Sequence, residues 1–287
     1  MRRRGASVGL AAIALASSLA GSALAAPDED ALGKGEGYPA CPPSAHVEQR
    51  CVVGLATRRD ETWPARTVAK GDRAAPLARA TAEPRIAYRY AQVEGGLDAY
   101  LDTTRTTGLL IVRDGTILAE RYQYGATPAS RMTSFSMAKT VTAMLVGIAL
   151  ADGAIASIDD RADQYVPALR GTPYGATTIR HLLTMSSGIR FEETYSGSDD
   201  LATLARLSLF GGSDGGAATL APFVSRERPP GERFHYSSAD TQALGLVLRA
   251  PQYSPANNTD APKGRLSVTR LELLAPKVPS TSTAPMR

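Results

Sequence analysis

Cysteine and histidine are scarce in this sequence, with two Cys and three His among 287 residues. A structural zinc site takes four Cys or His ligands, and His46 between Cys41 and Cys51 supplies too few. We therefore expect no metal. The two cysteines lie ten positions apart, so in an oxidising compartment a disulfide between them is expected, with two free thiols as the alternative.

The sequence also lacks an unbroken apolar run of the ~20 residues that a membrane-spanning helix needs. At the N-terminus, Arg2–Arg4 precede the apolar segment Val8–Leu19, and Ala23–Ala25 follows as a small-residue cleavage site. Residues 1–25 are therefore interpreted as a signal peptide, with an N-terminal membrane anchor as the alternative. We expect a periplasmic or secreted protein without stable membrane insertion after cleavage.

Lysine is rare as well, although Arg raises the sequence pI to about 9.1. A basic pI can indicate a nucleic-acid partner. Three of the 32 basic residues, Arg2, Arg3 and Arg4, lie in the segment expected to be removed, and the others nearly balance the 28 acidic residues. The sequence has no basic stripe interleaved with aromatic residues, so we expect no nucleic-acid partner.

Changes of composition divide the rest of the chain into three parts. Residues 26–85 are rich in Ala, Pro, Arg and acidic residues, which predicts a partly irregular N-terminal extension. Residues 86–250 carry regular apolar patterns and are expected to form a folded domain. Residues 251–287 hold six prolines with many Ser and Thr, which predicts a disordered tail.

Local patterns predict the main elements of residues 86–250. Asp114-Gly115 predicts a β-hairpin over Gly108–Tyr122, because this dipeptide accepts the positive φ angles of a tight turn. The predicted helix over Ser136–Leu150 is apolar on nearly all sides, which predicts burial on most sides. Stretches without internal Pro predict helices over three ranges, Ser136–Leu150, Thr177–Met185 and Ala239–Ala250.

Ser136-Met137-Ala138-Lys139 is the constellation that most directly suggests chemistry. Residues three apart share a helix face, so the Lys139 amine can reach the Ser136 hydroxyl. A serine hydroxyl needs a base to become a good nucleophile. Burial in apolar surroundings would favour the neutral amine, which can serve as that base. The structural alternative is a serine that only caps a helix and a lysine that extends to solvent.

Tyr236 is a second candidate, because it lies where an extended segment meets the start of a predicted helix. A tyrosinate stabilised by a neighbouring ammonium could accept the Ser136 proton and return it to a leaving group. A tyrosine that only packs is the alternative. His181 and His235 leave a Ser-His-Asp arrangement open, although no serine lies in a G-x-S-x-G pattern.

These motifs, in this order, resemble the β-lactamase-related serine hydrolases, in the branch with class C β-lactamases, D-alanyl-D-alanine carboxypeptidases, esterases and 6-aminohexanoate-dimer hydrolases. The likeness covers residues 85–250 and rests on the segments Ser136–Lys139, His181–Gly188 and Pro230–Ser237. It implies an α+β fold of the β-lactamase/transpeptidase type, with a helical subdomain and an antiparallel sheet.

The resemblance also implies an acyl-enzyme mechanism on an amide or ester of a small molecule or peptide, without a cofactor. Ser136 would attack the carbonyl, while Lys139 and Tyr236 handle the proton. The loop from Glu192 to Asp200 falls where the nylon-oligomer-hydrolase branch has a substrate-covering loop, which makes Tyr195 within it a substrate-binding candidate. Ser238 is another, because it stands where the family has Asn in a Tyr-x-Asn motif.

One family motif, Lys or His followed two positions later by Gly, has no match after Tyr236, since Lys263-Gly264 lacks the middle residue. In the family this motif lies on a strand, and its segment supplies the middle strands of the sheet and one N–H that binds the oxyanion. The hairpin Gly108–Tyr122 should therefore keep an unpaired edge. We expect residues 251–287 to replace a lost domain end, which leaves two functions open: a serine hydrolase, and a non-catalytic secreted remnant or ligand-binding fragment of the same fold.

Overall fold

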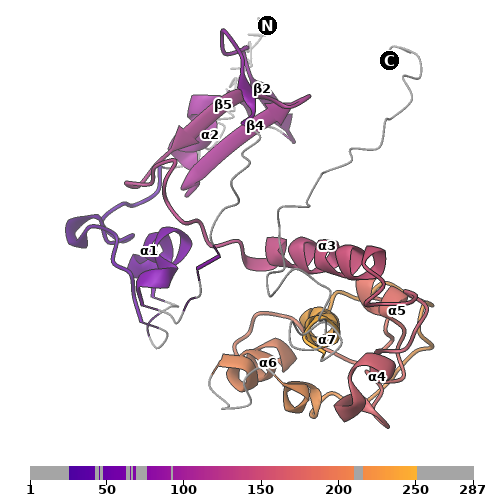
Figure 1. The fold of residues 1–287 in the computed structure, drawn as a ribbon. Coiled ribbons are helices and arrows are strands. Elements are labelled where there is room, and N and C mark those ends of the chain that lie inside the picture. The colour runs from indigo at the N-terminus through magenta and orange to yellow at the C-terminus, as the bar shows by residue number, and fades with distance from the viewer. Residues whose placement is uncertain are drawn as a thin grey trace, which may run out of the picture. The chain divides into compact units, whose positions relative to one another are not determined.

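The structure is a computed structural model that describes residues 26–42, 45, 48–62, 65, 67–68, 76–91, 93–209 and 216–250. The predicted signal peptide and the predicted Pro-rich tail lie outside the described residues, as do His46 and Lys263. The chain divides into two compact units (Figure 1), Met1–Val68 with Ala75–Thr133 and Ala69–Ala74 with Ser134–Arg287.

The first unit contains a small sheet whose centre follows from the Asp114-Gly115 turn. β4 (Gly108–Arg113) and β5 (Thr116–Tyr122) pair antiparallel, and the two turn residues have φ angles of 51° and 72°. The predicted hairpin is confirmed. β1 (Ala78–Arg79) runs parallel to β5 on its other side, so the sheet is mixed. Among the described residues β4 is an edge strand, as expected for this hairpin.

A short helix covers one face of this sheet. Leu97 and Leu101 of α2 (Leu97–Thr103) are buried against Ala119 of β5. Alternation along β4 leaves Leu110 on the opposite face, where 53% of its surface is exposed. A separate antiparallel pair precedes α2 and consists of β2 (Ala87–Tyr90) and β3 (Val93–Gly96).

A disulfide joins Cys41 and Cys51 in the N-terminal part of this unit, so the predicted pairing is confirmed. Both cysteines are buried, and Cys51 directly precedes α1 (Val52–Thr57). The cross-link therefore fixes the start of α1 within the irregular extension. The other helical segments here are single 3₁₀ turns, η1 (Lys34–Glu36), η3 (Gln49–Cys51) and η4 (Arg59–Glu61).

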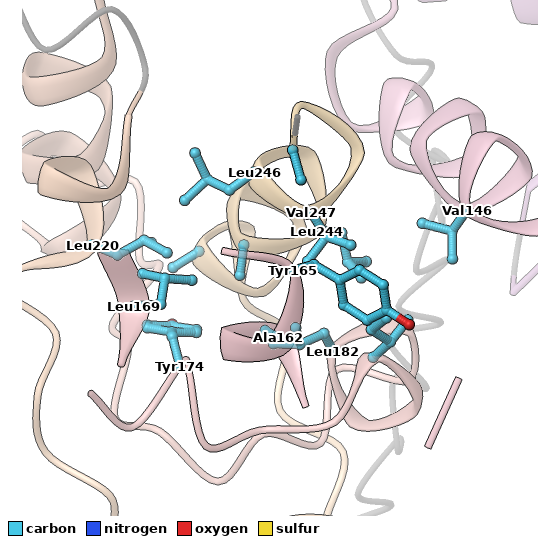
Figure 2. Close-up of a cluster of buried hydrophobic side chains, with 14 of the residues drawn as sticks. Val146, Ala162, Tyr165, Leu169, Tyr174, Leu182, Leu220, Leu244, Leu246 and Val247 are labelled. Carbon is cyan, nitrogen blue, oxygen red and sulfur yellow. The ribbon is translucent and has the colours of Figure 1, made fainter. Parts of the chain in front are cut away.

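The second unit is helical and is organised around α7 (Ser238–Leu248). Leu244, Leu246 and Val247 of α7 lie in the middle of the hydrophobic core (Figure 2). The Ser237 hydroxyl caps this helix by accepting a hydrogen bond from the Asp240 N–H. α7 contacts α3 (Ala138–Ala151), α4 (Ala162–Tyr165), α5 (Ile179–Leu183), α6 (Asp200–Leu209) and η7 (Ala217–Leu220). The described residues of this unit also form two short 3₁₀ helices, η5 (Phe135–Met137) and η6 (Pro167–Leu169).

The three predicted helices are confirmed as η5 with α3, as α5 and as α7, and α6 is an additional helix. The predicted burial of α3 on most sides is wrong. Only Val146 and Ala149 are buried, whereas Val141 is 50% exposed. These two residues are three apart and share one face, which is the only stripe that the described residues of its own unit cover. None of the described helices is long and apolar enough to cross a membrane.

Gly188 makes a close backbone crossing possible after α5. Its φ is +73°, and an added Cβ would lie 2.1 Å from the Arg228 carbonyl oxygen. The Gly188 carbonyl accepts a hydrogen bond from the Glu227 N–H at 2.9 Å. A side chain at position 188 would therefore push apart the two segments that lead to the core.

Gly188→Ala should lower the free energy of unfolding by more than about 1 kcal/mol, because both the positive φ and the close carbonyl disfavour a Cβ. Gly147→Ala is the matched control, since its Cβ would point into open space on α3. Alanine in a helix interior should raise the free energy of unfolding by about 0.5–1 kcal/mol. Urea unfolding followed by circular dichroism measures both, and equal effects would contradict this account.

Asp240 is a fully buried carboxylate in the first turn of α7. Its Oδ1 accepts a hydrogen bond from the Ser187 hydroxyl at 2.9 Å. Burial raises the pKa of Asp240 to about 6, although hydrogen bonds from Ser187 and Ser237 oppose the shift.

The raised pKa of Asp240 predicts that stability falls as the pH rises. The unfolded carboxyl, with an ordinary pKa of 3.8, ionises before the folded one does, so the destabilisation grows from about pH 4 and levels off above the folded pKa of about 6. This interval corresponds to a loss of about 3 kcal/mol.

Asp240→Asn cannot ionise and should remove most of this pH dependence while still accepting the Ser187 hydrogen bond. Urea unfolding at pH 4, 5, 6 and 7 compares it with the unchanged chain and with the exposed Asp152→Asn control. The control should keep the original slope. An identical slope in the Asp240→Asn variant would show that another group titrates.

Candidate active site

Ser136 and Lys139 lie one helical turn apart at the start of α3. Ser136 is the middle residue of η5, and α3 continues the same helical path from Ala138. The Lys139 Nζ donates a hydrogen bond to the Ser136 Oγ at 3.0 Å. The contact expected from the spacing is therefore present in the structure.

The residue before Ser136 has an unusual backbone. Phe135 has a φ of +43°, a left-handed conformation that a bulky side chain rarely adopts. Its side chain is 60% exposed. Such outliers cost of order 1–3 kcal/mol and cluster at functional sites. The sharp turn at Phe135 presents the Ser136 side chain at the surface, where a substrate can reach it.

Tyr236 completes the group. The Lys139 Nζ lies over the Tyr236 ring, 5.1 Å from its centroid. The negative face of the ring attracts a cation at this distance. The structure thus brings together Ser136, Lys139 and Tyr236, which are 100 positions apart at their extremes.

The environment of Lys139 differs from the expected apolar pocket. Lys139 is only partly buried and Ser136 is exposed, because the described residues of this unit leave the outer side of α3 uncovered. The predicted burial in apolar surroundings is wrong for the described residues. The Lys139 Nζ instead contacts the Ser136 hydroxyl and the face of the Tyr236 ring.

Backbone hydrogen bonds between the segments Pro230–Ser237 and His181–Gly188 position Tyr236. The His235 N–H donates to the Met185 carbonyl at 2.7 Å, and the Gly231 N–H donates to the Ser186 carbonyl at 2.8 Å. These bonds join the segment before Tyr236 to the loop that follows α5. Tyr236 is therefore fixed between this loop and the capped start of α7.

The two histidines have structural partners. His235 Nε2 donates to the Phe191 carbonyl at 2.7 Å, and His181 Nδ1 lies 3.0 Å from the Thr178 hydroxyl at the start of α5. Neither of these hydrogen bonds involves Ser136. The geometry therefore favours Lys139 and Tyr236 over a His-dependent arrangement.

The other two candidate residues, Tyr195 and Ser238, meet at a carboxylate that the sequence reasoning missed. Glu193 accepts hydrogen bonds from the Ser238 N–H at 2.9 Å, from the Ser238 hydroxyl at 3.0 Å and from the Tyr195 hydroxyl at 3.1 Å. The hydrogen bond to Glu193 raises the pKa of Tyr195, with smaller contributions from burial and from neighbours that include Tyr236. Through Glu193, the Tyr195 hydroxyl is linked to Ser238, which lies two residues after Tyr236.

Asp199 organises the loop that carries Tyr195. Its buried carboxylate accepts from the N–H groups of Thr194, Tyr195 and Ala202 at 2.6–2.9 Å. The bonds from Ala202 and the two other N–H groups lower the pKa of Asp199. They also hold Tyr195 at a φ of +60°. The sequence did contain a signal for Asp199, because Asp commonly caps a helix that starts at the next residue.

The described residues contain no group of three or more His, Cys, Asp and Glu side chains that could hold a metal ion. The polar side-chain groups described for the site are two hydroxyls, an amine, two phenols and one carboxylate. This set can transfer protons and form a covalent bond at Ser136.

Comparison with known proteins places this geometry in a family. The Beta-lactamase family pattern matches residues 96–256, more than half of the chain. The 6-aminohexanoate-dimer hydrolase of Paenarthrobacter ureafaciens is 27% identical over 208 residues, which cover 71% of this chain and 49% of that protein. The chain thus spans about half the length of this curated relative.

A solved structure from Bacillus anthracis, described as a candidate 6-aminohexanoate-dimer hydrolase, has a similar fold. It aligns with a TM-score of 0.61 at 20% sequence identity, over 71% of this chain and 56% of that one. The expected α+β fold of the β-lactamase/transpeptidase type is confirmed. The chain therefore belongs to the Beta-lactamase family, among the β-lactamase-related serine hydrolases.

Proposed function

We propose that this protein is an exported serine hydrolase that cleaves an amide or ester through an acyl-enzyme on Ser136. The observation that carries the proposal is the 3.0 Å hydrogen bond from Lys139 Nζ to Ser136 Oγ, with the same Nζ over the Tyr236 ring. The Ser136 hydroxyl, the Lys139 amine and the Tyr236 ring thus form one connected group, in which the exposed Ser136 hydroxyl is the nucleophile.

In the proposed reaction, the Ser136 Oγ attacks the carbonyl carbon and loses its proton to the Lys139–Tyr236 pair. Lys139 Nζ donates to Oγ in the structure, so as an ammonium it stabilises the developing alkoxide. A deprotonated Tyr236 is then the acceptor, and it returns the proton to the departing amine or alcohol. Water attacks the acyl-enzyme in the second half of the reaction and releases the acid. These steps need no cofactor.

The substrate class is a small amide or ester. The Paenarthrobacter relative is named for the 6-aminohexanoate dimer, which supports a small amide as the first substrate to test. The exposed position of Ser136 is compatible with a small molecule or a peptide. We propose Tyr195 and Ser238 as substrate-side residues, because both donate hydrogen bonds to Glu193 and Ser238 lies two residues after Tyr236.

Export is part of the proposal. The basic, apolar and small-residue pattern of residues 1–25 supports a signal peptide, and the Cys41–Cys51 disulfide is typical of proteins in oxidising compartments. We therefore propose a periplasmic or secreted location.

A fluorophosphonate probe should label the full chain covalently, and Ser136→Ala should abolish the label because Oγ is the attacking atom. Ser134→Ala is the matched control, an exposed serine two residues earlier, and it should label normally. Labelling is measured by intact mass. A folded chain without any label would instead support the non-catalytic ligand-binding fragment.

Tyr236→Phe should slow labelling by roughly 10²–10⁴-fold, because it removes the proton acceptor but keeps the ring under Lys139. Tyr90→Phe, at an 81% exposed tyrosine, should leave the rate unchanged. Lys139→Ala should be at least as slow as Tyr236→Phe. If His181→Ala or His235→Ala abolished labelling in a folded protein and Lys139→Ala did not, a His-dependent mechanism would replace this one.

A further inference from the structure

We propose that Glu193 is a positioning residue of this hydrolase, one that ties the loop bearing Tyr195 to the first turn of α7 beside Tyr236. The proposal rests on the proposed function, because it assigns Glu193 a role in substrate recognition at the same site. Its basis is the three hydrogen bonds that converge on one carboxylate.

The three donors come from two segments that are far apart in the sequence. Ser238 gives its N–H and its hydroxyl, and it is the first residue of α7, two positions after Tyr236. Tyr195 gives its phenol hydroxyl. A carboxylate offers only acceptors, so both of its oxygens match this set of donors. Glu193 therefore couples the position of Tyr195 to the backbone that holds Tyr236.

The start of α7 suits a negative charge. The first N–H groups of a helix have no intrahelical partner, and the helix dipole places partial positive charge there. Ser237 satisfies the Asp240 N–H, and Glu193 satisfies the Ser238 N–H. The carboxylate is thus held by the helix terminus as well as by the two side-chain hydroxyls.

Tyr195 has little else to hold its side chain. It is 72% exposed, and its backbone adopts the left-handed conformation that Asp199 maintains. Asp199 fixes where the residue leaves the loop, whereas Glu193 fixes where the phenol points. Without Glu193 the Tyr195 phenol loses its hydrogen bond and its side chain is free to rotate, so a substrate bound through this phenol would bind less tightly.

Hydrolysis of a series of p-nitrophenyl acyl esters of increasing length tests the proposal. Glu193→Ala should raise KM about tenfold for the longer esters and change kcat less, because Ser136, Lys139 and Tyr236 remain. Tyr195→Phe should give the same pattern, since it removes the hydroxyl that Glu193 holds. The double variant should be no worse than the worse single variant, because both changes break one tie.

Glu227→Ala is the matched control. Glu227 is exposed and its side chain pairs with Arg190, so its loss should leave KM unchanged. Glu193→Gln should recover part of the loss, because one amide oxygen can still accept the Ser238 N–H. Equal kinetics for the Glu193→Ala, Glu227→Ala and unchanged proteins, or fully additive effects in the double variant, would overturn the proposal.

A second measurement does not depend on activity. The Tyr195 titration is obtained as the ultraviolet difference between each protein and its Tyr195→Phe counterpart. Since the hydrogen bond to Glu193 raises the pKa of Tyr195, Glu193→Gln should lower that pKa and Glu227→Ala should not. If the protein is inactive but the Tyr195 pKa shifts, the hydrolase function and the role of Glu193 in recognition are rejected, and the hydrogen bond between Glu193 and Tyr195 is confirmed. If the protein is active but the Tyr195 pKa does not shift, only the positioning role of Glu193 is rejected.

Discussion

The hydrogen bond from the Ser187 hydroxyl to the buried Asp240 carboxylate is the constraint on which the rest of the second unit depends. A buried carboxylate is destabilising unless hydrogen bonds compensate for its lost hydration. Here the Ser187 hydroxyl of the loop after α5 donates to the carboxylate, and the Ser237 hydroxyl at the cap of α7 accepts from the Asp240 N–H, so both segments are held by the same buried residue. Tyr236 lies directly before that cap. Its position is therefore determined by the hydrogen bonds of the buried Asp240 and not by the secondary-structure preference of the residues around it.

The same reasoning explains why Lys139 has a different setting from the one expected. An apolar helix suggests a buried lysine, but composition says only that a face can be buried, not which element covers it. Val146 and Ala149 meet the core, and Val141, on the same turn as Lys139, is half exposed. In this partly solvated setting the Lys139 amine contacts the Ser136 hydroxyl and lies over the ring of Tyr236. The proposed mechanism therefore assigns proton handling to Lys139 and Tyr236 together and not to an isolated, desolvated lysine.

The sequence was sufficient wherever one or two residues determine a local geometry. Asp114-Gly115 predicted the hairpin, and the Ser136–Lys139 spacing predicted the contact that is observed, because both depend on neighbours within a turn. The interaction of Glu193 with Ser238 spans 45 positions, and no local pattern distinguishes Glu193 from Glu192 beside it. Long-range partners of this kind depend on the packing of α7, so they became visible only with the fold.

A serine at position 238, where the family motif has an asparagine, changes what this part of the site can do. An asparagine amide offers one acceptor and two donors to a ligand. Ser238 instead directs both its hydroxyl and its N–H to Glu193, so the polar group nearest to Tyr195 is a carboxylate. That carboxylate already accepts three hydrogen bonds, so its capacity for a direct ligand contact is reduced. Under the proposed function, the exchange of Asn for Ser moves recognition from the motif residue to the loop and assigns the contact with substrate to the phenol of Tyr195.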